Sequence, residues 1–255
     1  MDIYNPTALI FRKTYELDIH DIVPTPLEVL AWQKMPASSV SPRITRLMDD
    51  AIGLFNDLAQ PCGLMEDFDS DGFPGIYIGN GMNASDSPVP SIVARADATA
   101  LMAATMGDAL AVKCSELFAE KNASLGYMLN VVASAASERL GGQMCRLFLD
   151  SLRSEPRVSR EEKSMENIKV QYYCPGHCGW HISGQEKLFA ALHPEEIGVS
   201  IGEHWVMHPF KSISGIMAAA PIDVHRFQPG FSFCPQCRER RCIERLELLR
   251  GLPGL

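Results

Sequence analysis

Apolar residues recur at helical spacing directly after Ser41. Serine is a favourable N-cap and Pro42 suits the first helical position, so the sequence predicts a helix that begins here. The apolar positions from Ile44 to Leu58 are mostly three or four residues apart and define one buried face. We expect this helix to end before Pro61, because proline cannot continue it.

A longer helical pattern covers residues 97–152. It divides into one helix over about 108–120 and a longer helix over about 124–152, whose apolar stripe is rich in alanine and other small residues. Small residues permit close contact between helices. The pair Gly141-Gly142 marks a point where the longer helix can kink or break.

The remaining segments predict short strands, turns and short helices. Residues 1–40 look irregular because prolines interrupt their apolar runs, and residues 62–95 look like short strands and turns. Within the latter, residues 76–78 form a plausible strand before the turn signal Asn80-Gly81. In the second half we expect strands at residues 170–173, 199–201, 205–208 and 213–219, and helices at residues 185–192 and 235–249.

The order of these elements predicts an α+β fold, in which a helical N-terminal part packs with a mixed or antiparallel sheet. Strands and helices do not alternate as they do in βαβ units. A charged segment at residues 151–166 is low in hydrophobic residues and is typical of a solvated linker. We therefore divide the chain into a helical part (1–155), a strand-rich part (156–233) and a cysteine-rich tail (234–255).

The charge balance bears on the kind of partner. With 23 Lys and Arg residues against 31 Asp and Glu residues, the formal charge is −8. A nucleic-acid-binding protein normally shows a basic face, whereas the only dense basic run, residues 238–241, lies among cysteines and acidic residues. We therefore predict no nucleic-acid partner. The sequence shows no signal peptide and no long uncharged apolar stretch, which predicts a cytoplasmic protein without membrane contact.

Eight cysteines in such a protein are more typical of thiols and ligands than of disulfides. Five of them fall into two groups, Cys174 and Cys178 in a C-x3-C pattern, and Cys234, Cys237 and Cys242 in a C-x2-C-x4-C pattern. Cysteines spaced two or three residues apart, at turns made by proline or glycine, can chelate one ion or cluster. We predict a metal centre on these five residues.

The identity of the metal is open on spacing alone. An iron–sulfur cluster such as [4Fe-4S] takes four thiolates and would leave one cysteine spare, and the thiolate set favours it modestly. Zinc accepts the same set, with His177 or His181 as substitute ligands. The alternative without a metal is a set of reduced structural thiols, with Cys242 facing the core from a terminal helix. The isolated cysteines are expected to be small buried hydrophobes: Cys62, Cys114 and Cys145.

Three segments of the second half follow one another in a recognisable order. They are Pro175-Gly176-His177-Cys178-Gly179-Trp180, Pro194-Glu195-Glu196-Ile197-Gly198-Val199 and Pro209-Phe210-Lys211-Ser212-Ile213-Ser214-Gly215. They resemble the binding turn, the Glu-Ile-Gly-Val segment and the Pro-x-x-Ser-x-Ser-Gly strand of the activation (reactivation) domain of cobalamin-dependent methionine synthase, especially of its free-standing relatives. Residues 29–58 and 133–138 look like the helical part of that domain. The resemblance therefore covers most of the chain.

The resemblance implies a binding turn and a role. In that family the domain binds S-adenosylmethionine, docks onto a cobalamin-binding module and supports the reductive methylation of inactive cob(II)alamin. The family's turn reads Arg-x-x-x-Gly-Tyr, which places Tyr172, Gly176 and His177 at the ligand. Tyr172 stands at the arginine position and cannot replace its bidentate contact with the ligand's carboxylate, which puts S-adenosylmethionine binding in doubt. Cys174 and Cys178 occupy the same turn, where a redox centre would suit electron delivery to cobalt.

The chain carries no cobalamin-binding Asp-x-His-x-x-Gly motif, because the segment Asp18-Ile19-His20-Asp21-Ile22-Val23 has valine where glycine is required. We therefore expect the corrinoid to belong to a partner, a corrinoid-binding methyltransferase or corrinoid protein, and an electron donor to be a further partner. The first hypothesis is an accessory protein that reactivates such a methyltransferase through an iron–sulfur or other metal centre. The second is a zinc-stabilised, non-catalytic interaction module. An independent S-adenosylmethionine-dependent methyltransferase is disfavoured, since no Gly-rich strand-to-helix loop is present. No catalytic residue is assigned.

Overall fold

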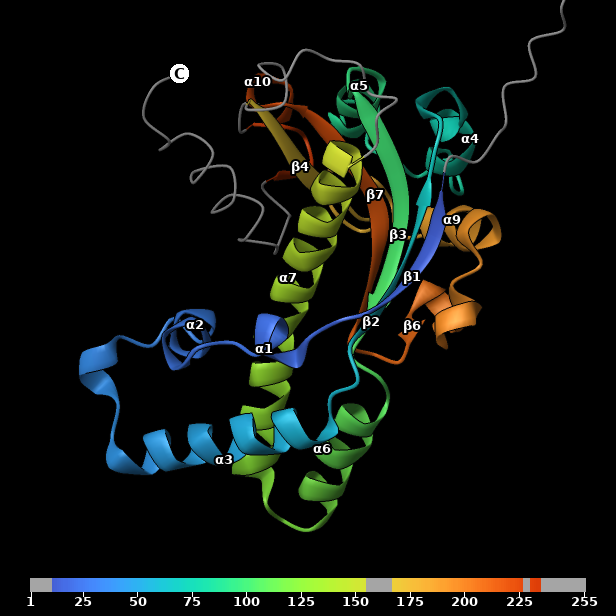
Figure 1. Ribbon diagram of the computed structural model, residues 1–255. Coiled ribbons are helices and arrows are strands. Elements are labelled where there is room, and N and C mark those ends of the chain that lie inside the picture. The colour runs from blue at the N-terminus through green and yellow to red at the C-terminus, as the bar shows by residue number, and fades with distance from the viewer. Residues whose placement is uncertain (1–10, 155–166, 227–229, 235–255) are drawn as a thin grey trace, which may run out of the picture.

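A five-stranded antiparallel sheet forms the centre of the protein (Figure 1). The computed structural model describes residues 11–154, 167–226 and 230–234. The strand order is β1-β2-β3-β7-β4, so β3 lies in the middle and takes β2 and β7 as neighbours. These strands are β1 (Arg12–Glu16), β2 (Cys62–Asp67), β3 (Ala98–Thr105), β7 (Ser212–Pro221) and β4 (Ile168–Tyr173). The sheet therefore combines strands from the predicted helical part (1–155) with strands from the predicted strand-rich part (156–233).

Helices cover both faces of this sheet. On one face the 32-residue helix α7 runs lengthwise across β3, β7 and β4, and α3 and α6 pack against α7 (Figure 1). On the other face lie α4, α5 and α9. The helices are α1 (Ile19–Ile22), α2 (Pro26–Trp32), α3 (Pro42–Leu58), α4 (Phe73–Tyr77), α5 (Val89–Ala94), α6 (Ala109–Ala119), α7 (Ala123–Ser154), α9 (Gly184–Leu192) and α10 (Ile222–His225).

Shorter elements complete the described chain. A two-stranded antiparallel ladder pairs β5 (Ser200–Ile201) with β6 (Met207–His208). The 3-10 turns are η1 (Ala37–Ser39), η2 (Ser70–Gly72), η3 (Pro194–Ile197) and η4 (Glu203–Trp205).

The two faces of the sheet bury separate cores. Neighbouring residues of β2 show the alternation: Met65 points into the core under α7, whereas Leu64 points into the core under α4 and α9. The first core also holds Phe55 and Phe148, and the second holds Trp180; all five side chains are at most 1% exposed. This period of two is the expected consequence of a pleated strand buried on both faces.

The strongly amphipathic segments form the helices that the sequence predicts. Helix α3 begins at Pro42, and the Ser41 hydroxyl accepts a hydrogen bond from the backbone N–H of Ile44 at 3.3 Å. Helix α7 continues through Gly141 and Gly142 without a break. Gly141 has another purpose, because a Cβ at this position would lie 2.6 Å from the ring of Tyr172 in β4. The glycine lets the sheet edge approach the helix.

Other elements differ from the expectations. Residues 98–105, expected to be helical, form the central strand β3, and the expected strand at residues 76–78 is replaced by the end of α4. Strand β3 is apolar at nearly every position because both faces are covered, so the period-two signal is absent from its sequence. The irregular N-terminal segment contains β1, α1 and α2, of which α2 starts with a capping box between Thr25 and Glu28. The expected helix at residues 235–249 lies outside the described residues.

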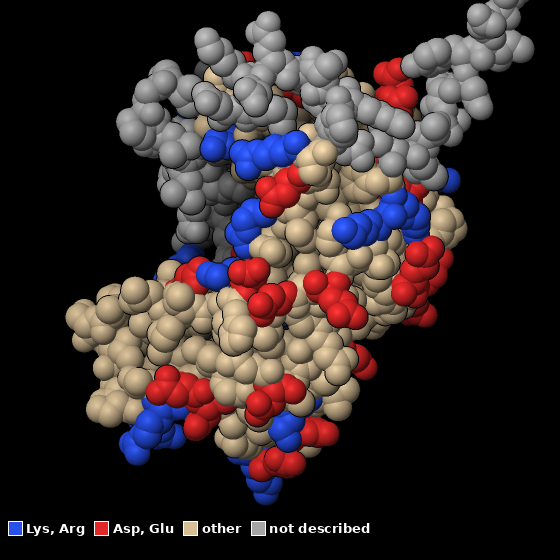
Figure 2. All heavy atoms as spheres, viewed as in Figure 1, with Lys and Arg blue, Asp and Glu red and all other residues tan. Residues whose placement is uncertain are grey.

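The α+β fold class is confirmed, and the sheet is antiparallel. No helix in the described ranges is long and apolar enough to cross a lipid bilayer. On the face shown in Figure 2, the described Lys and Arg side chains are interspersed with Asp and Glu and form no continuous basic stripe.

Candidate functional site

The residues between β4 and α9 form a tight turn that carries two of the cysteines. Its backbone is closed by three hydrogen bonds: His177 N–H donates to Cys174 O at 3.1 Å, Trp180 N–H donates to His177 O at 2.9 Å, and Gly176 N–H donates to Trp180 O at 2.7 Å. Gly176 has φ 93°, a conformation that glycine adopts without strain. Cys178 also has a positive φ, 51°. A non-glycine residue held there is strained, and such positions cluster at functional sites.

Trp180 anchors this turn in the core. Its side chain is 1% exposed, meets the ring of Phe73 edge-on at 5.4 Å and lies 5.7 Å from the ring of Tyr77. The indole nitrogen packs against the Cα of Gly184, where no side chain would fit. Because Phe73 and Tyr77 both belong to α4, the turn and this helix are held as one unit.

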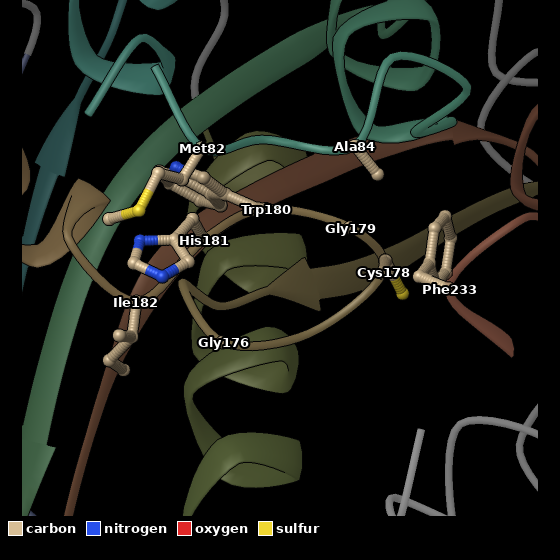
Figure 3. Close-up of a pocket in the computed structure, with 9 residues that line it drawn as sticks. All are labelled: Met82, Ala84, Gly176, Cys178, Gly179, Trp180, His181, Ile182 and Phe233. Atoms are coloured by element: carbon tan, nitrogen blue, oxygen red, sulfur yellow. The ribbon is translucent and has the colours of Figure 1, made fainter. Parts of the chain in front are cut away.

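A pocket of about 400 Å³ opens beside the turn (Figure 3). His181 and Ile182 lie toward one end, and Cys178 and Phe233 lie toward the other. The polar side chains among the lining residues are those of His181 and Cys178. The full lining set is Met82, Ala84, Gly176, Cys178, Gly179, Trp180, His181, Ile182 and Phe233.

The orientation of His181 is fixed from several sides. Its backbone N–H donates to Asn83 Oδ1 at 2.8 Å, and its Nδ1 shares a hydrogen bond with the Ser183 hydroxyl at 2.8 Å. The Trp205 ring meets the imidazole edge-on at 5.9 Å. With Nδ1 engaged by Ser183, Nε2 is the ring nitrogen left for a pocket ligand.

Three of the five predicted metal ligands lie within the described residues. Cys178 is buried, while Cys174 and Cys234 are half-buried. Cys174 packs against β7, with its Sγ 3.3 Å from the place where a Cβ at Gly215 would stand. Cys237 and Cys242 lie outside the described residues. Among the residues that the structure does describe, no three His, Cys, Asp or Glu side chains are grouped to hold a metal ion, so the five-cysteine centre stays a prediction.

The C-terminal cysteine segment nevertheless meets the turn. Phe233, which directly precedes Cys234, lines the pocket and contacts Gly179: a Cβ on this glycine would lie 2.8 Å from Phe233 Cε1. The Cys234 N–H donates to Phe231 O at 3.0 Å, and the rings of Phe231 and Phe233 are stacked 5.3 Å apart. Cys234, far from Cys178 in sequence, therefore directly follows a residue of the pocket that Cys178 lines.

The predicted ligand-binding residues do not all face this pocket. Gly176 lines it, and His177 forms part of the turn. Tyr172 instead packs with the core under α7, where its hydroxyl lies 3.5 Å from Glu138 Oε2. Tyr172, which stands where the family has arginine, therefore lies on one face of the sheet, and the pocket at Cys178 lies on the other.

Two features of this region were not predicted. Residues 80–87, between α4 and α5, hold the turn through several hydrogen bonds, although only the Asn80-Gly81 turn signal marks this loop in the sequence.

On the α7 side, Lys211 is 9% exposed and donates to the Ser134 hydroxyl at 2.8 Å. Burial lowers the pKa of Lys211. A buried lysine has no periodic signature that would reveal it in sequence.

The isolated cysteines Cys62, Cys114 and Cys145 are half-buried, whereas the sequence predicted them to be buried. Burial raises the pKa of the Cys62 thiol, and the nearby Glu16 carboxylate adds to this effect. Burial likewise raises the pKa of Cys114. Thiols with raised pKa are weak nucleophiles and weak metal ligands, because both roles need the thiolate.

The fold as a whole matches a known domain. The crystal structure of the MetH reactivation domain bound to AdoHcy has a TM-score of 0.52 to this chain at 15% sequence identity, and the match covers 98% of this chain and 89% of that chain. No family model matches the sequence. No curated protein matches it. The predicted resemblance to the methionine synthase activation domain is thus confirmed for the fold, over nearly the whole chain.

Proposed function

We propose that this chain is an accessory protein for the reactivation of a cobalamin-dependent methyltransferase, whose corrinoid belongs to the partner. The observation that carries the proposal is the match to the MetH reactivation domain over 98% of the chain. The one segment that partly resembles a cobalamin-binding motif has a structural role here: Asp18 caps α1 and accepts the backbone N–H of His20 at 2.9 Å. A separate corrinoid partner is therefore part of the proposal.

The proposal includes a metal centre on Cys174, Cys178, Cys234, Cys237 and Cys242. Support comes from the contact of Phe233 with Gly179, which joins the segment of Cys234 to the turn of the first pair. Cysteine sulfur favours iron–sulfur clusters and zinc over hard cations. An iron–sulfur cluster would supply one-electron chemistry at this pocket. The burial of Cys178 would limit solvent access on its side of such a cluster, which is one of the protein's controls on reduction potential.

S-adenosylmethionine fits the predicted binding residues poorly. The side chain at the family's arginine position is Tyr172, which carries no positive charge, and its hydroxyl lies 3.5 Å from the Glu138 carboxylate. A ligand carboxylate placed here would meet an acidic neighbour instead of a guanidinium. Calorimetric titration of the purified protein with S-adenosylmethionine is expected to give no binding heat.

The metal centre is tested by anaerobic purification followed by iron, sulfide and zinc quantification and an absorption spectrum. Iron with sulfide and a broad visible absorption band supports the redox role, and zinc alone supports the interaction-module alternative. The matched variants are Cys178→Ser and Cys62→Ser, because only Cys178 belongs to the proposed ligand set. Loss of metal in the first variant alone is expected. Equal metal content in both variants would remove Cys178 from the set.

The reactivation role needs a separate assay, because it does not depend on which metal is bound. A cobalamin-dependent methionine synthase from which its own reactivation domain has been deleted, loaded with cob(II)alamin, is mixed with this chain and a low-potential one-electron donor. We expect faster loss of the cob(II)alamin absorption than with the donor alone. No binding to the truncated enzyme and no change in rate would reject this partner class.

A further inference from the structure

The loop at residues 80–87 carries no cysteine, but it contacts the turn of Cys174 and Cys178 and the segment that directly precedes Cys234. Toward the turn, Ala84 N–H donates to Gly179 O at 2.8 Å and the Ser87 hydroxyl donates to Cys178 O at 2.7 Å. Both acceptors are backbone carbonyls, so these bonds hold the backbone of the turn and do not depend on its side chains. Figure 3 shows the loop residue Ala84 beside Gly179.

The same loop reaches the C-terminal segment through Asp86. One carboxylate oxygen accepts the backbone N–H of Ser232 at 2.6 Å, and the other accepts the Ser232 hydroxyl at 2.7 Å. These two bonds engage both oxygens of the carboxylate, and they lower the pKa of Asp86. Asp86 and Ser232 are both exposed, so water competes for these bonds, but the acceptor is charged and meets two donors of one residue.

The neighbours of Ser232 extend this attachment. Phe233 fits against Gly179, which has φ 77° and no room for a side chain, and the stacked Phe231 ring supports Phe233. Cys234 follows directly, with its N–H bonded to Phe231 O. Two carboxylate bonds and one aromatic contact therefore hold the residues that directly precede Cys234.

We propose that Asp86 is a positioning residue, which fastens the segment of Cys234 beside the turn that carries Cys174 and Cys178. The positioning role rests on the proposed metal centre. The attachment itself rests only on the hydrogen bonds between Asp86 and Ser232. A ligand that is placed before the metal arrives loses less conformational freedom on binding, so the affinity of the whole set is higher. Asp86 would thus act through Cys234 and touch no metal.

The test compares Asp86→Ala with Asp57→Ala, which removes an exposed aspartate of α3 far from the pocket in sequence and structure. Hydrogen exchange at the amides of residues 230–234 is measured by mass spectrometry, and metal loss to a chelator is followed in the same preparations. We expect several-fold faster exchange and several-fold faster metal loss in Asp86→Ala only, with unchanged thermal unfolding in both variants.

The outcomes separate the two proposals. Faster exchange in a protein that holds no metal in any variant supports the attachment and rejects the metal centre. Unchanged exchange in Asp86→Ala overturns the attachment, whatever the metal content. Faster exchange with unaltered metal loss overturns the positioning role, because the metal centre would then not depend on where Cys234 is held. Asp86→Glu, which keeps the carboxylate, is expected to restore part of the slow metal loss.

Discussion

The adjacent glycines of α7, Gly141 and Gly142, give opposite expectations for the same substitution. Replacing either by alanine removes a glycine from a helix interior, which stabilises a helix by about 0.8–1.0 kcal/mol. At Gly142 the nearest atom to a new Cβ is the Arg146 Nη1 at 4.0 Å, so this gain is expected in full. Gly142→Ala should therefore raise the free energy of unfolding by roughly 1 kcal/mol.

At Gly141 the same methyl group has no space. Its Cβ would lie 2.6 Å from two ring carbons of Tyr172 and 2.8 Å from the hydroxyl oxygen. The ring cannot easily move away, because Tyr172 belongs to β4 and its neighbours in the strand pair with β7. Overpacking of this kind costs about 1–3 kcal/mol, which offsets or exceeds the helix gain. We expect Gly141→Ala to be less stable than Gly142→Ala by about 1–3 kcal/mol.

Urea denaturation, followed by circular dichroism, measures both variants on the same scale. The double variant Gly141→Ala with Tyr172→Leu supplies the control, because loss of the ring should remove most of the penalty at Gly141 and give a favourable coupling energy. Equal stability of the two alanine variants would refute the close approach of α7 and β4. An additive double variant would show that the penalty has a source other than Tyr172.

Three further expectations concern buried and half-buried side chains. Burial lowers the pKa of Lys211. Between this lowered pKa and the ordinary lysine value near 10.4, the unfolded state binds more protons than the folded state. The free energy of unfolding therefore rises with pH in this window. Lys211→Met should raise the free energy of unfolding at neutral pH by roughly 1–3 kcal/mol and flatten that rise, as measured by urea denaturation across pH. Trp180→Ala should cost about 3–5 kcal/mol in the same assay at neutral pH, while Trp180→Phe should cost less. Burial raises the pKa of Cys62 and Cys114, so mass spectrometry should show slower alkylation of both thiols at neutral pH in the folded protein than in urea.

The parts of the fold that could be predicted from sequence are those with one exposed face. Helix α3 combines a serine cap, a proline at its first position and an apolar stripe, and each of these signals is local. Strand β3 has no such signal, because helices cover both of its faces and alanine and methionine fill positions that also suit a helix. Its pairing with β2 and β7 involves residues far along the chain, and no local window contains them.

The candidate site divides in the same way. The turn at Cys174 and Cys178 could be expected from its glycines, its proline and the spacing of its thiols, all within a few residues. The loop that holds it could not, because Ala84 contributes a backbone N–H and Ser87 a hydroxyl, groups found everywhere in proteins. Cys178 and Ser87 are 91 residues apart, so only the folded chain brings them together.

Among the described cysteines, Cys174 and Cys178 are held more firmly than Cys234, and this has a consequence for the proposed metal centre. The turn has three internal backbone hydrogen bonds, four hydrogen bonds with the loop at residues 80–87 and a buried tryptophan, and together these hold the backbone of Cys174 and Cys178. The segment of Cys234 depends on Asp86 and on one aromatic contact. Because ordering the less firmly held ligands is the larger entropic cost, the C-terminal side should control metal affinity. Substitutions at Asp86 or its contacts should therefore increase metal loss. Equally conservative substitutions in the turn of Cys174 and Cys178, if they leave its fold intact, should change metal loss less.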